Sequence, residues 1–139
     1  MDEKEKISRK LRNMKKYLDF LRSYKSITKE ELEENYELES AIERNFHLAI
    51  ESVLDIGEII ISAEDFEKPE DYRSIILILG KKGIIPKDFA EYFADIAGFR
   101  NILVHLYEDL DIEKLHNYLQ NNLEDISEFA KYIANYIEK

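Results

Sequence analysis

Apolar side chains recur along almost the whole chain at the three- and four-residue spacing of an amphipathic helix. A strand with one buried face would instead alternate apolar and polar residues. The first apolar stripe predicts a helix that ends near Tyr24. The residues of this stripe are Ile7, Leu11, Met14, Leu18 and Leu21. This helical period limits the possible folds more than any other feature of the sequence.

Capping residues divide the next part of the pattern. Thr28 and Glu31 have the spacing of a capping box, which predicts that a short helix or the start of a long one follows. A second long helix is expected from about Leu38 to Ser62. Pro69 marks a break, after which Asp71 is expected to cap a third helix.

The pattern predicts two more helices. Gly83 is placed to terminate the third helix, and Pro86 suits the first turn of a fourth. The stripe of the fourth helix consists of Phe89, Phe93, Ile96 and Leu103. Asp111 is expected to cap one last helix, whose buried side consists of Leu115, Leu119, Ile126, Phe129 and Ile133.

Turn-forming residues are scarce: the 139 residues include 4 Gly and 2 Pro. A β-sandwich or barrel needs many tight turns, so that architecture is disfavoured. We therefore predict a single all-α domain over residues 1–139, an antiparallel bundle of four to five helices.

The sequence also restricts location and partners. It has no Cys, no apolar run near the roughly 20 residues of a membrane span, and a charged N-terminus without the apolar core of a signal peptide. We expect a cytoplasmic protein without membrane contact. The net charge of −10 disfavours wrapping of nucleic acid by bulk electrostatics but leaves local phosphate binding open.

The segment GFRNILVHLYEDLD, residues 98–111, is not explained by packing alone. Arg100, Asn101, His105 and Tyr107 cluster among apolar neighbours. Each alone fits a solvated helix end, where a His gains from the helix dipole. Together, an Arg that can hold a phosphate and a His that exchanges protons near neutral pH supply the groups for RNA cleavage without metal or cofactor.

Helix geometry complicates this interpretation, because positions five apart lie roughly 140° apart around a helix. Arg100 and His105 would therefore diverge, whereas Asn101 and His105 share a face. The helix could end before His105, or the Arg stem could swing round. We favour a third arrangement, a homodimer whose two-fold axis brings two copies together and supplies a second His as general acid.

These residues resemble the R-x4-H-x-Y motif of the HEPN superfamily, in particular its HepT-like toxin branch. Arg100, His105 and Tyr107 match the motif without gaps, and the resemblance extends over essentially the whole chain. It is carried by AIERNFHLAIESVLDIGEIIIS at 41–62, by the stretch at 71–111 and by the C-terminal LEDISEFAKYI.

The resemblance implies an endoribonuclease toxin that acts without metal on RNA, as a homodimer with the motifs lining a shared cleft. Arg100 and His105 would be catalytic, and Asn101 would support the site. The family's partner is an MntA-like nucleotidyltransferase antitoxin that transfers AMP to the motif tyrosine, here Tyr107. Added bulk and phosphate charge would then repel and block RNA.

His47, Glu51 and Asp55 follow each other at steps of four and share one side of the second long helix. Such residues can hold zinc or iron in a helical bundle, but we disfavour a metal site here. Glu51 and Asp55 are expected either to pair with basic groups or to line the cleft and orient the motif residues. His116 is expected to be solvated.

Two rival functions stay open. The chain could be a binding module that presents Tyr107 or a nucleotide to a partner nucleotidyltransferase and cuts nothing. It could also be a purely structural bundle, in which Arg100 and His105 affect stability alone.

Overall fold

The computed structural model describes residues 2–104 and 111–139, and every regular element within them is a helix. The all-α prediction is confirmed. The described helices are α1 (Glu3–Arg22), α2 (Lys29–Glu34), α3 (Tyr36–Ala63), α4 (Tyr72–Lys81), α5 (Lys87–Phe93), α6 (Ile96–Val104), α7 (Ile112–Asn121) and α8 (Leu123–Glu138).

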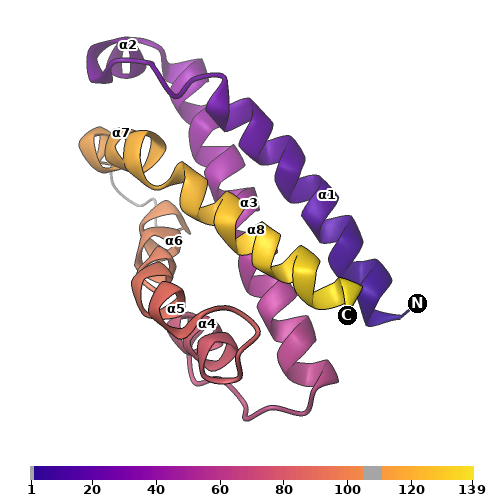
Figure 1. Cartoon of the computed structure of the whole chain (residues 1–139). Helices are drawn as coiled ribbons and strands as arrows, with labels where there is room; N and C mark the ends of the chain where they lie inside the picture. Colours follow the sequence, from indigo (N-terminus) through magenta and orange to yellow (C-terminus); the bar gives the residue numbers. More distant parts are fainter. Residues whose placement is uncertain (1, 105–110) are drawn as a thin grey trace.

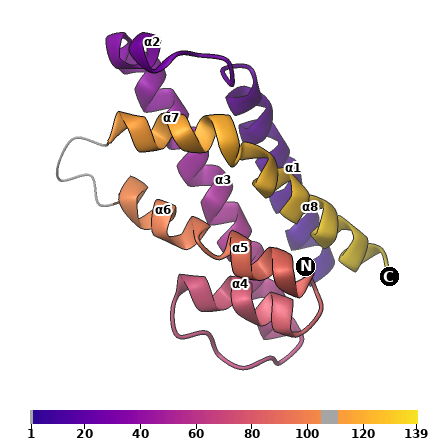
Figure 2. The ribbon, with the colours of Figure 1, turned by 60° about the vertical axis from the view of Figure 1, so that its left-hand side comes forward.

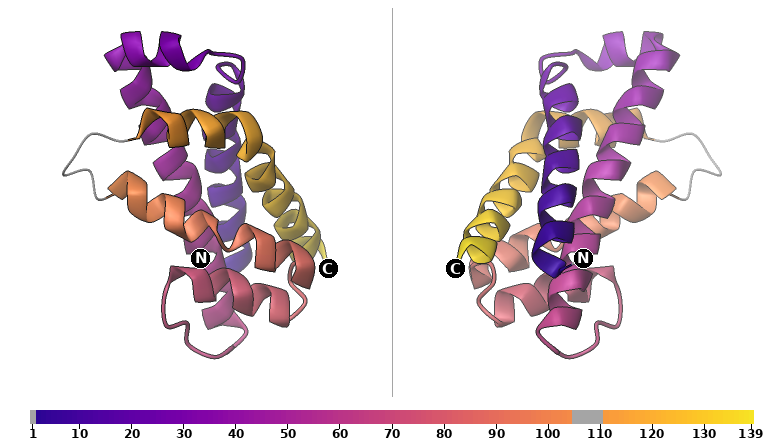
Figure 3. Two further views of the ribbon diagram at one scale, coloured as in Figure 1. Left: turned by 90° about the vertical axis from the view of Figure 1, so that its left-hand side faces the viewer. Right: turned by 90° about the vertical axis from the view of Figure 1, so that its right-hand side faces the viewer.

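The frame of the molecule is the antiparallel pair of long helices α1 and α3, which make the most extensive contact in the fold (Figure 1). The last helix, α8, packs against both of them. On the other side of α3 lies α6, while α4 and α5 lie at the end of the molecule where α3 terminates (Figures 2 and 3). The predicted antiparallel bundle is therefore confirmed.

Aromatic rings hold α6 against its neighbours. Phe99 of α6 lies edge-on to Phe46 of α3, with ring centroids 5.5 Å apart, and its face stacks on Tyr118 of α7 at 3.7 Å. Phe46 and Phe99 are almost completely buried. Since burial of such rings dominates core energetics, these contacts fix the helix that carries Arg100.

The capping residues lie where the sequence places them. The Thr28 hydroxyl accepts from Glu31 N at 3.1 Å, and the Glu31 carboxylate accepts from Thr28 N at 3.1 Å, which completes the capping box. Asp71 and Asp111 cap α4 and α7. Gly83 follows α4 with a φ of 75°, the left-handed conformation that favours glycine at a helix end.

The prediction of one continuous fourth helix is wrong, because the chain turns at Ala94 and Asp95, between α5 and α6. Ala97 N and Gly98 N bond to the carbonyls three residues earlier, as in a tight 3₁₀-type turn. Phe93 and Phe99, six positions apart, would point roughly 120° apart on a straight helix. The turn lets both rings face the core.

The prediction of one continuous last helix is also wrong, because the chain bends at Asn122, between α7 and α8. The Asn122 side-chain amide donates to Asp125 at 3.1 Å and to the Tyr92 hydroxyl at 3.2 Å. Asn side chains that form such local bonds compete with the helical backbone pattern. No Gly or Pro marks this bend in the sequence.

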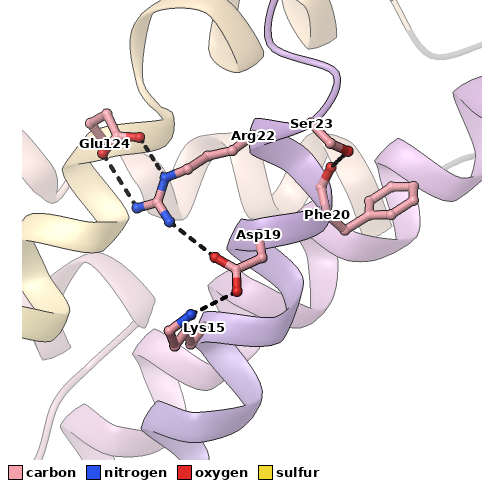
Figure 4. A network of polar contacts seen from close by, with 6 residues as sticks. All are labelled: Lys15, Asp19, Phe20, Arg22, Ser23 and Glu124. Carbon is pink, nitrogen blue, oxygen red and sulfur yellow. Dashed lines mark hydrogen bonds and ion pairs between the residues drawn. The ribbon is translucent and has the colours of Figure 1, made fainter.

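Ion pairs link the C-terminal part of α1 to the first turn of α8. An exposed chain of ion pairs runs from Lys15 through Asp19 and Arg22 of α1 to Glu124 of α8 (Figure 4).

The prediction that His116 is solvated is wrong: it is half-buried, and its Nε2 lies 2.8 Å from the Ile27 carbonyl oxygen.

In the part of the chain that the structure describes, no helix has both the length and the apolar composition needed to cross a membrane.

Candidate functional site

A row of polar side chains runs along α3 at steps of four residues. We call this row the α3 ridge; it consists of Glu39, Glu43, His47, Glu51 and Asp55. Residues four apart are neighbours on a helix surface, so these side chains form one continuous line. All five are half-buried, because α3 is flanked by α1 and α6.

Arg100 of α6 reaches the middle of the ridge. Its Nε donates to Glu51 Oε1 at 2.7 Å, and its guanidinium carbon lies 4.3 Å from the ring centroid of Tyr72, the first residue of α4. Its Nη1 donates to Asn101 Oδ1 at 3.4 Å. The Arg100 side chain is 16% exposed, so three other groups fix the position of a largely buried guanidinium.

His47 approaches the same carboxylate oxygen from one turn earlier on α3. Its Nε2 lies 3.4 Å from Glu51 Oε1, the atom that accepts from Arg100. The His47 side chain is 28% exposed, so solvent and solutes can reach the ring. A single oxygen therefore stands between an imidazole and a guanidinium.

Asp55 faces another helix. Its Oδ2 accepts from Lys10 Nζ of α1 at 3.1 Å, so of the two roles left open for Asp55 the structure shows pairing with a basic group. Glu51 alone of the two carboxylates bonds to Arg100. No described hydrogen bond joins Asp55 to Arg100 or Asn101.

The ridge has an unusual carboxyl group towards its N-terminal end. Burial raises the pKa of Glu43 to about 7, and the negative charge and hydrogen bond of the neighbouring Glu39 also raise it. Near neutral pH this carboxyl therefore exists in both its protonated and its ionised form.

His105 and Tyr107 lie outside the described residues, so their predicted roles stay predictions. Among the described residues, no group of three or more His, Asp or Glu side chains is placed to hold a metal ion. On the ridge itself, Asp55 bonds to Lys10 while Glu51 bonds to Arg100.

Sequence reasoning missed Tyr72 and gave His47 no role beyond a possible metal ligand. Nothing in the sequence brings Tyr72 to Arg100, because the two residues lie on different helices. The spacing of His47 and Glu51 did place them on one side of α3, which is the signal for their contact. Lys10 has no distinguishing signal among the many lysines of its helix.

The arrangement suits the binding of an anion. Glu51 occupies Nε of Arg100, and the described residues offer no hydrogen-bond partner to Nη2. A guanidinium held in this way presents its outer donors in a fixed orientation, as bidentate recognition of a phosphate requires.

The chain is similar to known ribonucleases. A family model described as ribonuclease HepT-like matches residues 14–133. A tRNA nuclease HepT of Aphanizomenon flos-aquae is 26% identical over 131 residues, which span 94% of this chain and 89% of that protein. An mRNA nuclease HepT of Shewanella oneidensis is 23% identical over 103 residues, which span 74% and 77%.

Solved structures show the same fold. A tri-AMPylated HEPN toxin of Shewanella oneidensis, in complex with an MNT antitoxin, matches with a TM-score of 0.83 at 21% identity. The match covers 97% of this chain and 99% of that one. At this identity the likeness concerns the fold, and the family model carries the relationship.

Proposed function

The chain belongs to the HepT-like ribonuclease family, and on that premise we propose that it is a metal-independent endoribonuclease, the toxin of a toxin–antitoxin pair acting in the cytoplasm. The observation that carries the proposal is the Arg100 guanidinium, held by Glu51 and Tyr72, whose Nη2 has no hydrogen-bond partner among the described residues.

In the proposed reaction, Arg100 binds the scissile phosphate and compensates the charge that builds on it. His105 accepts the proton of the ribose 2′-hydroxyl as the 2′-oxygen attacks phosphorus. The bond to the 5′-oxygen breaks, which leaves a 2′,3′-cyclic phosphate and a 5′-hydroxyl. Asn101 and Glu51 orient Arg100, and Asp55, one turn after Glu51 on α3, has a supporting role.

The proposal includes a homodimer in which two copies of the Arg100 segment line one cleft. Polar groups on α3 and α6 that are half-buried within one chain would then face a second copy. Sedimentation of the purified chain over a range of concentrations tests this assembly.

We further propose that a nucleotidyltransferase antitoxin of the MntA type neutralises the chain by transferring AMP to Tyr107. Tyr107 is seven positions after Arg100, so each adenylate would bring phosphate charge close to the phosphate-binding guanidinium. Like charges repel, and RNA binding would weaken. The relative from Shewanella oneidensis that carries three adenylates supports this regulation.

The decisive experiment measures RNA cleavage by the purified chain in EDTA. We expect cleavage by the wild type and loss of at least about a hundredfold in Arg100→Ala and His105→Ala, the range for a group that acts in the transition state. Arg22→Ala is the matched control, because Arg22 also pairs with a carboxylate but lies at the α1–α8 contact. Equal traces of cleavage in all four proteins would refute the proposal.

The pairing of Arg100 with Glu51 favours a second candidate, a binding module that presents Tyr107 or a nucleotide to a partner nucleotidyltransferase and cuts nothing. Mass spectrometry after co-expression with an MntA-like transferase separates the two. A gain in multiples of one adenylate that disappears in Tyr107→Phe, together with no cleavage by the unmodified chain, would favour the module.

A further inference from the structure

His47 is the described imidazole nearest the Arg100 site that the proposed function leaves unused. Its Nε2 and the Nε of Arg100 lie on either side of Glu51 Oε1, at 3.4 Å and 2.7 Å. All three side chains are partly accessible, at 28% for His47, 31% for Glu51 and 16% for Arg100. A phosphate bound to the outer donors of Arg100 would therefore lie close to this ring.

The contact with Glu51 suits a ring that transfers protons. A carboxylate beside one ring nitrogen fixes the orientation of an imidazole and compensates the charge of the imidazolium form. The other nitrogen, Nδ1, has no hydrogen-bond partner among the described residues, which leaves it available to a substrate oxygen.

The other described histidine is unsuited to this role. His116 lies on α7, and its Nε2 is within hydrogen-bonding distance of the backbone oxygen of Ile27. No described contact links it to Arg100 or to the α3 ridge. It therefore serves as a control for the loss of an imidazole elsewhere in the fold.

We propose that His47 is a further catalytic residue, the general acid that gives its proton to the leaving 5′-oxygen. This inference rests on the proposed ribonuclease function. As the 2′-oxygen bonds to phosphorus and gives its proton to the base, the bond from phosphorus to the 5′-oxygen breaks. The imidazolium of His47 protonates that oxygen and becomes neutral, so no water or cofactor is consumed.

This assignment changes what the dimer has to supply. Arg100 and His47 belong to the same chain, so the second proton-transfer group need not come from the His105 of a second copy. The dimer would then shape the cleft without completing the catalytic set.

The test compares two RNA substrates that differ in one atom of the leaving group. A 5′-bridging sulfur leaves as a thiolate and needs no proton, whereas the ordinary 5′-oxygen does. We expect His47→Gln to slow cleavage of the oxygen substrate by about 10²–10⁴-fold, the usual range for a general acid. Cleavage of the sulfur substrate should stay within about tenfold of wild type, on the same principle. His116→Gln should not distinguish the substrates.

Each other outcome has a definite meaning. If His47→Gln slows both substrates equally, His47 positions Glu51 and Arg100 and the general-acid assignment is refuted. If it slows neither, His47 has no part in the reaction. If the wild type cleaves neither substrate, the ribonuclease function itself fails, and the inference fails with it. Circular dichroism and thermal unfolding of His47→Gln show whether the variant is folded.

Mixing inactive variants tests whether the two groups act within one chain. A heterodimer of Arg100→Ala with His47→Gln has one site without the guanidinium and one without the imidazole if both groups come from one chain. We then expect no recovery of oxygen-substrate cleavage. Recovery to an appreciable fraction of wild type would mean that the groups act across the dimer and would overturn the single-chain assignment.

Discussion

Glu51 and Arg100, 49 positions apart in the sequence, meet at 2.7 Å between the middle of α3 and the centre of α6. This contact determines how the candidate site is built. It sets the direction of the guanidinium through Nε and leaves the outer nitrogens to other partners. A carboxylate therefore lies beside a group that we expect to bind phosphate. Glu51 orients the guanidinium through Nε and does not occupy the place of the phosphate.

Truncation of Glu51 should release Arg100. We expect Glu51→Ala to slow RNA cleavage by about a hundredfold, because a small displacement of a positioning group has effects of that order. Glu51→Gln retains an oxygen that accepts from Nε, so its loss should be smaller. Single-turnover cleavage measures both. Glu124→Ala, which removes the carboxylate partner of Arg22, is the matched control and should cleave like wild type. Wild-type cleavage by Glu51→Ala would contradict the positioning role.

The ring of Tyr72 should matter more than its hydroxyl. Tyr72→Phe keeps the aromatic face under the guanidinium, whereas Tyr72→Leu removes it. A cation–π contact contributes about 0.5–1 kcal/mol at an exposed site and about 2 kcal/mol when desolvated. Because the guanidinium is largely buried, Tyr72→Leu should lower the free energy of unfolding by about 1–2 kcal/mol and raise KM for RNA. Urea denaturation and steady-state cleavage provide the readouts. Equal behaviour of the Phe and Leu variants would argue against the contact.

Glu43 should make stability depend on pH. Its pKa rises on folding from the ordinary 4.5 to about 7, so folding favours the protonated carboxyl. This contribution is fully present below pH 4.5 and is lost as the pH rises through 7. Glu43→Gln imitates the neutral form at every pH. We therefore expect the free energy of unfolding of the variant, relative to wild type, to increase between pH 4.5 and pH 8.

Urea denaturation of both proteins across this pH range isolates the effect of Glu43, since the other titrating groups are shared. A constant difference between the two proteins would show that the carboxyl titrates alike in the folded and unfolded states. A difference that shrinks as the pH rises would reverse the expected sign.

Two helical glycines should respond in opposite directions to alanine. A Cβ on Gly57 of α3 would overlap the Ile75 side chain of α4, whereas a Cβ on Gly98 of α6 has no neighbour within 4 Å. Overpacking costs about 1–3 kcal/mol, which exceeds the gain of about 1 kcal/mol in helix propensity. We expect Gly57→Ala to lower the melting temperature and Gly98→Ala to raise it. Higher stability in both variants would mean that α4 can move away from α3 freely.

Local patterns in the sequence were enough to predict the helical class and the residues at which several helices begin. The three- and four-residue period and the capping side chains Thr28, Asp71 and Asp111 act within one or two turns, so neighbouring residues suffice to predict them. The motif from Arg100 to Tyr107 is contiguous in the sequence, so it too could be recognised without the structure, and it indicated the family.

The side chains that surround Arg100, in contrast, could not be predicted without knowing how the helices pack. Tyr72, Glu51 and Arg100 come from three helices, and their contact depends on how α3, α4 and α6 pack. The same packing accounts for the turn at Asp95, because the rings of Phe93 and Phe99 both face the core. At Asn122, the hydrogen bond from its side-chain amide to the Tyr92 hydroxyl likewise depends on the packing of α5 against the bend. Local spacing carries no information on such contacts, because the free energy that selects them comes from surfaces far apart along the chain.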